Sequence, residues 1–197
     1  KLVCPWLAVE REPKLLVTPS LLSTITTAST DSLEALAVRF FERSVGQWNS
    51  KRRYYTLKSG DVQEVVSELT IEFLSGEHPT MLALADTHGL ADPLVCGVQF
   101  AWQSSYISPS RKQSVGSTAF GIRNNMLYRD RGFATPKPVV ASYEFRDRNT
   151  MQLHTEYNGS AFDEELKLIG DSYRTRQTII SRAGEEIMIG QYLETRV

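Results

Sequence analysis

Two different periods of apolar residues divide the chain into a short helical part and a much longer part made of strands. Apolar residues fall on one face at helical spacing at Leu33, Leu36, Ala37, Phe40 and Phe41. Asp31 and Glu34 form a capping-box pattern, and Gly46 is a suitable stop. These features predict a helix that begins at Asp31 and ends before Gly46.

From Trp48 onward, apolar and polar residues alternate, as they do in half-buried strands. The alternation predicts strands near residues 48–57, 67–74, 81–85, 98–104, 117–122, 126–133, 139–145, 151–157, 173–182 and 187–196. Turn residues such as Asn158-Gly159 and Ala183-Gly184 separate them. Short strands in series, with no long crossover helices, predict a mainly β protein: an antiparallel up-and-down β-barrel of roughly eight to ten strands behind an N-terminal helix.

Composition favours a single globular domain and excludes several kinds of partner. The 197 residues are 41% hydrophobic and 23% charged, and no apolar run is long enough to cross a membrane. The formal net charge of -1 gives no electrostatic footprint for nucleic acid. Residues 1–30 are rich in Ser, Thr and Pro without a clean period, so we expect an N-terminal extension, either a tail, a targeting remnant or an artificial addition. The barrel domain is then 31–197.

The residues that usually hold metals or act as nucleophiles are scattered. No nucleophile elbow, phosphate-binding loop or dinucleotide fingerprint is present. His78, His88 and His154 lack companion ligands, which predicts no metal site. Cys4 and Cys96 lie far apart and form neither a disulfide framework nor a zinc motif.

Arginines are unusually frequent on the predicted strands. They come in three pairs: Arg52 with Arg53, Arg146 with Arg148, and Arg174 with Arg176. Guanidinium groups bind carboxylates in a planar, bidentate way, so arginines at a barrel mouth would suit an anionic ligand. The alternative is that most of them are solvated residues of the outer face.

Trp48, Trp102, Glu156 and Glu164 are further candidates for the barrel interior. In lipocalin-like barrels the tryptophan of a Gly-x-Trp turn plugs the closed end, often under an arginine from the last strands, and Trp48 is expected to do so. Trp102 could pack against a flat conjugated ligand, although core packing explains it equally well. A carboxylate of Glu156 or Glu164 that faced the interior would need a donor there.

Several motifs together resemble one family. Residues Phe40 to Arg52 match FF-x-x-S-x-G-x-W-x-S-x-R, the opening of the S-type phycobiliprotein chromophore lyases (the CpcS/CpeS family). GVQFAW, GFATPKPVVASYEF, TEY, FDEEL and YRTRQT follow in the order of the family. The chain departs from the family at Tyr55, where many relatives have His, and in LKLIGDSY after FDEEL, which lacks the Trp-Phe and Asn-Leu residues of the family. The resemblance spans roughly Asp31 to Val197.

The resemblance implies a lipocalin-like barrel that holds a linear tetrapyrrole without a permanent bond and delivers it to a cysteine of a phycobiliprotein. The expected catalytic residues are Glu156, Glu164 and Arg174. The expected bilin-binding residues are Arg52, Tyr55, Trp102, Arg146, Arg148, Tyr157, Arg174 and Arg176. Among these, the arginines would meet the propionates, a glutamate the pyrrole nitrogens, and Trp102 the rings.

The phycobilin would be a substrate rather than a cofactor, with phycoerythrobilin expected and phycocyanobilin as the other candidate. The expected partner is a phycobiliprotein β subunit, whose cysteine supplies the nucleophile. A homodimer, or a requirement for a paralogue, is left open. We expect a plastid location, with the cyanobacterial cytoplasm as the alternative. A lipocalin-type carrier of bilins or other small hydrophobic ligands, without transfer activity, shares every barrel feature and is the alternative function.

Overall fold

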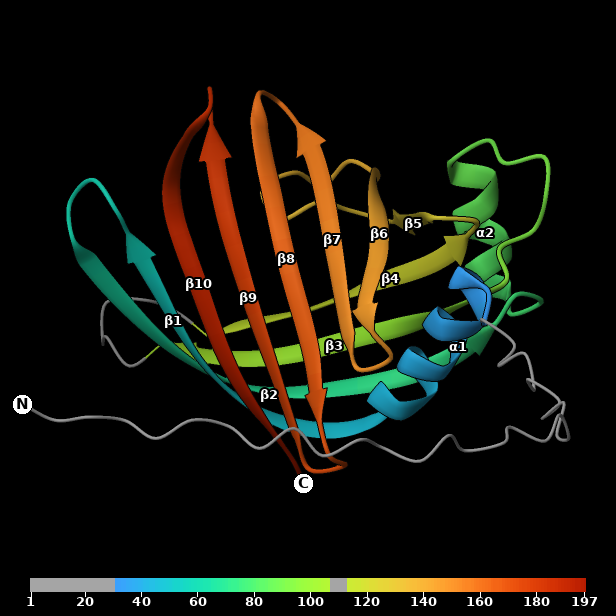
Figure 1. Cartoon of the computed structure of the whole chain (residues 1–197), viewed down its shortest axis with the longest axis horizontal. Coiled ribbons are helices and arrows are strands. Elements are labelled where there is room, and N and C mark those ends of the chain that lie inside the picture. The colour runs from blue at the N-terminus through green and yellow to red at the C-terminus, as the bar shows by residue number, and fades with distance from the viewer. Residues whose placement is uncertain (1–30, 107–112) are drawn as a thin grey trace, which may run out of the picture. The chain divides into compact units, whose positions relative to one another are not determined.

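The structure, a computed structural model, describes residues 31–106 and 113–197. The helices are α1 (Leu33–Ser44) and α2 (Pro79–Thr87). The strands are β1 (Gly46–Thr56), β2 (Asp61–Ser75), β3 (Cys96–Tyr106), β4 (Ser114–Arg123), β5 (Met126–Arg129), β6 (Val139–Asp147), β7 (Thr150–Tyr157), β8 (Ser160–Ile169), β9 (Tyr173–Arg182) and β10 (Glu185–Arg196). Figure 1 shows β6 to β10 on one side of the molecule and β2 to β4 crossing behind them.

Each strand pairs antiparallel with its neighbour in sequence, and the sheet closes where β1 pairs with β10. The closing register runs from Trp48 opposite Arg196 to Thr56 opposite Met188. Closure pairs the two strands that would otherwise be free edges, which are the usual sites of unwanted strand addition. The predicted antiparallel barrel with an N-terminal helix is therefore confirmed.

The N-cap of helix α1 lies one residue later than the capping-box pattern predicts. Ser32 is the N-cap, and its side chain accepts a hydrogen bond from the backbone N–H of Ala35 at 3.1 Å. The carboxylate of Glu34 accepts instead from the backbone N–H of Asn124, in the turn between β4 and β5. Asp31 forms an ion pair with Arg39. A contact distant in sequence thus replaces the local bond that the pattern predicts.

The apolar face of α1 closes one end of the barrel, together with Trp48. Phe40 is buried and meets the Phe145 ring edge to face at 5.7 Å. Trp48 is also fully buried, and its indole N–H donates to the carbonyl of Ser44 at 2.9 Å. The guanidinium of Arg196, from the last strand, lies 4.2 Å from the Trp48 ring. The prediction that Trp48 plugs the closed end under an arginine is confirmed.

The structure differs from the sequence prediction at three elements: α2, β8 and β5. The expected strand at 81–85 is helix α2, which begins with Pro79 after an N-cap at His78. Pro suits the first turn of a helix because its missing N–H would have no partner there. The apolar run at residues 81–85 was too short to distinguish a helical period from a strand period. Strand β8 was not predicted at all, because Glu164 points inward and breaks the apolar alternation of that strand.

The fifth strand is shorter than predicted, ending at Arg129 rather than at Phe133. The residues that follow it, up to Lys137, form an irregular segment that takes part in the site below. The predicted N-terminal extension, including Cys4, lies outside the described residues. In the part that the structure describes, neither helix is long and apolar enough to span a membrane.

Substitution of Phe40 tests the role of α1 as the plug. We expect Phe40→Ala to lower the free energy of unfolding by about 3–5 kcal/mol, because a large core side chain is lost and a cavity stays behind. Leu82→Ala, in the exposed face of α2, is the control and is expected to change stability by less than about 0.5 kcal/mol. Urea unfolding followed by tryptophan fluorescence measures both. Equal losses in the two variants would contradict the plug.

Candidate functional site

A cavity of about 570 Å³ opens inside the barrel, in the half away from α1. Its wall comes from the later residues of β1 and β3, the start of β4, the segment after β5, and β9 and β10. The lining residues with polar or aromatic side chains are Arg52, Tyr54, Phe100, Trp102, Ser104, Tyr106, Ser114, Thr118, Phe120, Arg129, Arg131, Phe133, Thr135, Arg176 and Tyr192. A cavity of this size and composition suits a ligand of a few hundred daltons.

The charge of the cavity wall is strongly one-sided. Among the described lining residues, four are arginines, Arg52, Arg129, Arg131 and Arg176, and none is Asp or Glu. Charges of one sign in a partly enclosed, low-dielectric space raise the local concentration of the opposite sign. The cavity is therefore suited to an anionic ligand with aromatic or conjugated groups.

Beneath the cavity, two of these arginines are fixed by the buried carboxylate of Glu164. Its Oε1 accepts from Arg129 at 2.8 Å, and its Oε2 accepts from Arg176. The three side chains come from β5, β8 and β9, so only the closed sheet brings them together. Burial raises the pKa of Glu164, but the guanidiniums of Arg129 and Arg176 outweigh it and hold that pKa below its ordinary value. The cluster is an ionised carboxylate with two cations, and it keeps one positive charge in excess.

A second buried ion pair lies closer to the plug. Arg174 Nε donates to Glu194 Oε2 at 2.5 Å, and Ser50 donates its hydroxyl to Oε1 of the same carboxylate at 3.2 Å. The Arg174 guanidinium also lies 5.0 Å from the Trp48 ring. Burial lowers the pKa of Arg174, and Glu194 opposes that shift. Arg174 does not line the large cavity, so its role here is to join β9, β10 and the Trp48 plug.

Arg52 is the interior arginine with the most freedom to meet a ligand. It has no ion pair with a carboxylate among the described residues; its Nε donates to the Ser50 hydroxyl at 3.2 Å. Its guanidinium lies 5.4 Å from the Tyr192 ring, which Tyr54 meets edge to face at 5.7 Å. Burial raises the pKa of Tyr192, so that its hydroxyl stays neutral. Arg52 thus presents to the cavity a positive charge without a carboxylate partner among the described residues, and its contact with a ligand stays a prediction.

Trp102 lines the cavity from β3, beside the start of β4. The cross-strand partner of Trp102 is Gly116, where an added Cβ would lie only 2.5 Å from the indole. Any larger residue at position 116 would displace the ring, so Gly116 is what lets Trp102 lie against the sheet. The predicted orientation of Trp102 toward the interior agrees with the structure, and its contact with a ligand stays a prediction.

Besides Arg174, which is buried nearer the plug, the structure corrects the placement of four predicted site residues that lie on the outside of the barrel. Tyr55, Arg146, Arg148 and Glu156 are not part of the cavity wall. Tyr55 follows the inward Tyr54 by one residue and therefore faces outward, next to Arg53. Arg146 and Arg148 are exposed at the turn near α1, where Arg146 lies 3.4 Å from Glu165.

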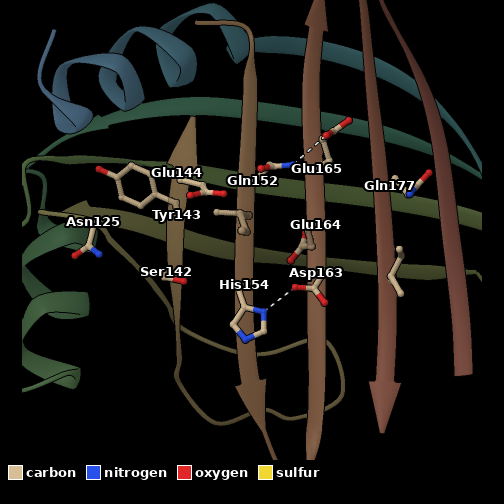
Figure 2. Close-up of a pocket in the computed structure, with 12 residues that line it drawn as sticks. Asn125, Ser142, Tyr143, Glu144, Gln152, His154, Asp163, Glu164, Glu165 and Gln177 are labelled. Carbon is tan, nitrogen blue, oxygen red and sulfur yellow. Dashed lines mark hydrogen bonds and ion pairs between the residues drawn. The ribbon is translucent and has the colours of Figure 1, made fainter. Parts of the chain in front are cut away.

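Glu156 lies on the outer face of β7, where its carboxylate is 3.0 Å from Nε2 of His154. Figure 2 shows the His154 ring pointing at Asp163 from the neighbouring strand, at 2.6 Å. Hydrogen bonds to these two carboxylates raise the pKa of His154, and the bond with Asp163 makes the larger contribution. A groove of about 610 Å³ runs over this face and is lined by Glu144, Asp163 and Glu165. Its negative charge would repel a dianion, so the interior cavity is the better candidate site.

Tyr157 does point inward, yet it lies behind the irregular segment after β5 and does not line the cavity. Its hydroxyl accepts from the backbone N–H of Ala134 at 3.0 Å. The lining residues that the sequence did not single out include Tyr54, Arg129, Arg131 and Phe133. The signal for Arg129 was present in the sequence, since it is two residues beyond the inward Leu127 on one short strand. The fold of the segment after it could not be predicted.

Comparison with known proteins agrees with this geometry. The family model described as "CpeS-like protein" matches residues 37–197. The chain belongs to the CpeS-like family. A protein of Nostoc sp. named "Putative phycocyanobilin lyase CpcS 2" is 54% identical over 166 residues, covering 83% of this chain and 92% of the relative. "Putative chromophore lyase CpcV" of Picosynechococcus sp. is 49% identical over 161 residues, covering 80% of each.

A solved structure, the "S-type Phycobiliprotein Lyase CPES from Guillardia theta", matches the fold with a TM-score of 0.70 at 24% identity. The match covers 85% of this chain and 94% of that one. The predicted family and the predicted enzyme class, a lyase, are confirmed. In the described part of this CpeS-like chain, no group of three or more His, Cys, Asp or Glu side chains could hold a metal ion.

Glu164→Gln tests whether the buried cluster is ionic. At neutral pH we expect the variant to be less stable than the wild type by about 3–5 kcal/mol, because two buried guanidiniums lose their counter-charge. Because the folded-state pKa of Glu164 lies below its ordinary value, its ionised form stabilises the fold at neutral pH, and this contribution is lost as pH falls through the lowered pKa.

The stability gap between wild type and Glu164→Gln should therefore narrow on acidification from about pH 7 to about pH 3. Urea unfolding across that range measures the gap. Glu156→Gln removes an exposed carboxylate of the same type and serves as the control, with little change at neutral pH. A gap that does not depend on pH would contradict an ionised Glu164.

Proposed function

We propose that this CpeS-like protein holds a phycobilin in the interior cavity, without a covalent bond, and transfers it to a cysteine of a phycobiliprotein subunit. The observation that carries the proposal is the cavity wall, with four arginines, several aromatic rings and no carboxylate among its described residues. A phycobilin is a flat conjugated chain that carries two propionates. Its charge and its shape match both features of the wall.

In this proposal, Arg52 and Arg176 bind the propionates and Trp102 packs against the pyrrole rings. Arg52 has no carboxylate partner in the described part of the chain, and Arg176 belongs to a cluster with one positive charge in excess. A propionate would therefore meet unsatisfied positive charge at both. Glu164 acts through Arg129 and Arg176, because each of its oxygens already accepts from a guanidinium.

The reaction is the addition of a thiol to a carbon–carbon double bond. The sulfur of the acceptor cysteine bonds to the ethylidene carbon on ring A, and the proton of the thiol goes to the adjacent ring carbon. No electrons are gained or lost. The contribution of this chain is to hold ring A in one orientation at the cavity mouth, which supplies proximity and suppresses wrong adducts.

The nucleophile in this scheme belongs to the acceptor. Cys96 is buried, and burial raises its pKa to about 12, so its thiol is neutral and inaccessible at ordinary pH. We propose a phycobiliprotein β subunit as the acceptor. For the bilin, phycoerythrobilin is the substrate predicted from the sequence, while the name of the Nostoc relative supports phycocyanobilin. Parallel titrations with both bilins decide between them.

The direct test mixes the protein with each bilin and a reduced apo-phycobiliprotein β subunit. We expect covalent adduct to form faster than in a mixture without the protein, with the absorption of a thioether-linked bilin after denaturation. Tight binding of the bilin without faster adduct formation would instead support the carrier. Preference for a fatty acid over either bilin would overturn both the bilin lyase and the bilin carrier, and would leave a carrier of other small hydrophobic ligands.

Neighbouring arginines on β1 give a matched test of the ligand site. Arg52 faces the cavity, whereas Arg53 faces outward and pairs with Glu64 at 2.7 Å. We expect Arg52→Gln to weaken bilin binding by about ten- to a hundredfold, the cost of one lost charge-assisted hydrogen bond, and Arg53→Gln to leave it unchanged. Absorbance titration measures both dissociation constants. Equal effects of the two substitutions would place the ligand elsewhere.

A further inference from the structure

An irregular segment forms one wall of the cavity between β5 and β6. It runs from Asp130 to Lys137, and Arg131, Phe133 and Thr135 are among its lining residues. Its conformation is held by a backbone hydrogen bond from Gly132 N–H to the Thr135 carbonyl at 3.0 Å. The Thr135 hydroxyl accepts from Lys137 N–H at 3.2 Å. The segment is thus a built part of the wall.

Tyr157 on β7 attaches this segment to the barrel. Its hydroxyl accepts from Ala134 N–H at 3.0 Å. An added Cβ at Gly132 would lie 2.9 Å from the Tyr157 ring and 2.8 Å from Thr135, so only glycine fits where the segment crosses the tyrosine. The Tyr157 hydroxyl and the close approach at Gly132 thus fix the middle of the segment, while Asp130 at its start is bonded to β4.

Three aromatic rings lie nearly parallel along the same side of the barrel. Tyr157 and Phe162 are 4.6 Å apart with 12° between their planes, and Phe162 and Phe133 are 5.5 Å apart with 8° between their planes. Phe162 is buried, whereas Phe133 lines the cavity and is 44% exposed. The stack thus ends in a ring whose surface is open to the cavity.

The Phe133 ring also lies beside the charged cluster. The guanidinium carbon of Arg129 is 5.6 Å from its centroid, and that of Arg176 is 5.2 Å away. On the far side of the cavity is Trp102. Trp102 comes from β3, whereas Phe162, which stacks on Phe133, comes from β8. These two strands are five positions apart in either direction around the ten-stranded barrel. Through its contact with Phe162, Phe133 thus lies across the cavity from the strand that carries Trp102.

We propose that Phe133 is a specificity-determining residue that packs against a ring of the conjugated ligand opposite Trp102. Tyr157 is a positioning residue that sets the Phe133 ring through Ala134. The inference rests on the proposed function, since it requires a flat conjugated ligand in the cavity. Its consequence is that the twist of the bound bilin, and hence its absorption band, depends on a residue outside the regular strands.

Substitutions of Phe133 separate stacking from simple filling of space. Phe133→Leu keeps an apolar side chain but removes the ring, and is expected to weaken binding of phycocyanobilin or phycoerythrobilin by roughly two- to tenfold, the range for an aromatic pair. The visible absorption band of the bound bilin should shift and broaden, because the bilin ring that packed against Phe133 is no longer held in one orientation. Phe133→Tyr restores a ring and should restore affinity and band shape.

Tyr157→Phe tests the positioning role, because it keeps the stack on Phe162 and removes only the hydroxyl that holds Ala134. We expect a shifted and broadened band with a smaller loss of affinity than in Phe133→Leu. Tyr173→Leu removes an exposed ring on β9 outside the cavity and is the control. Circular dichroism and urea unfolding show that each variant is folded before it is titrated.

The outcomes distinguish the two proposals. If the wild type does not bind either bilin, the proposed function fails and this inference fails with it. If the wild type binds and Phe133→Leu gives the same affinity and spectrum, only the role of Phe133 is overturned. If Phe133→Leu changes the spectrum and Tyr157→Phe does not, the positioning role of Tyr157 is overturned.

Discussion

A carboxylate held between two guanidiniums controls the charge inside this barrel. Glu164 forms ion pairs with Arg129 and Arg176, which come from other strands. Because all three side chains are largely buried, removal of any one of them would break a buried ion pair and destabilise the fold. The cluster keeps a positive charge in excess and places it directly beneath the cavity. Its geometry depends on the closed sheet, since the three side chains come from β5, β8 and β9.

The interior of the barrel and the outer face of β6 to β8 differ in charge. Among the described residues, the buried charged side chains are Arg129, Arg174, Glu164 and Glu194, and half-buried Arg52 and Arg176 add positive charge inside the barrel. On the outer face of β6 to β8, carboxylates predominate and surround His154. An anionic conjugated molecule is therefore attracted to the interior and repelled by the outer groove. The distinction between the two hollows is electrostatic, because their volumes are similar.

The barrel also separates stability from ligand binding along its axis. At one end, α1, Trp48, Arg196 and the Arg174–Glu194 pair fill the interior with contacts that leave no room for a ligand. At the other end, the wall includes an irregular segment and half-buried rings that have fewer partners. Polar groups at that end, such as Arg52, keep bonding capacity for a ligand because the plug and the buried pairs stabilise the fold without them.

The sequence by itself determined the architecture and the family of this protein. The alternation of apolar and polar residues predicted most of the strands, and the Gly-x-Trp turn predicted the Trp48 plug. The ordered motifs indicated the CpeS-like family. The inward placement of Trp102 agreed with the alternation of its strand. Local patterns were enough there because helix and strand periods depend on neighbours in sequence.

Only the tertiary structure decided which of the candidate residues share one cavity. A shift of one residue along a strand reverses its face, so Tyr54 lines the cavity while Tyr55 faces outward. Glu164 and Glu156 lie on adjacent strands, yet one is buried in an ion-pair cluster and the other bonds His154 outside. Phe133 lines the cavity because it lies on an irregular segment that is bonded to Tyr157. Such contacts join residues distant in sequence, and no local period encodes them.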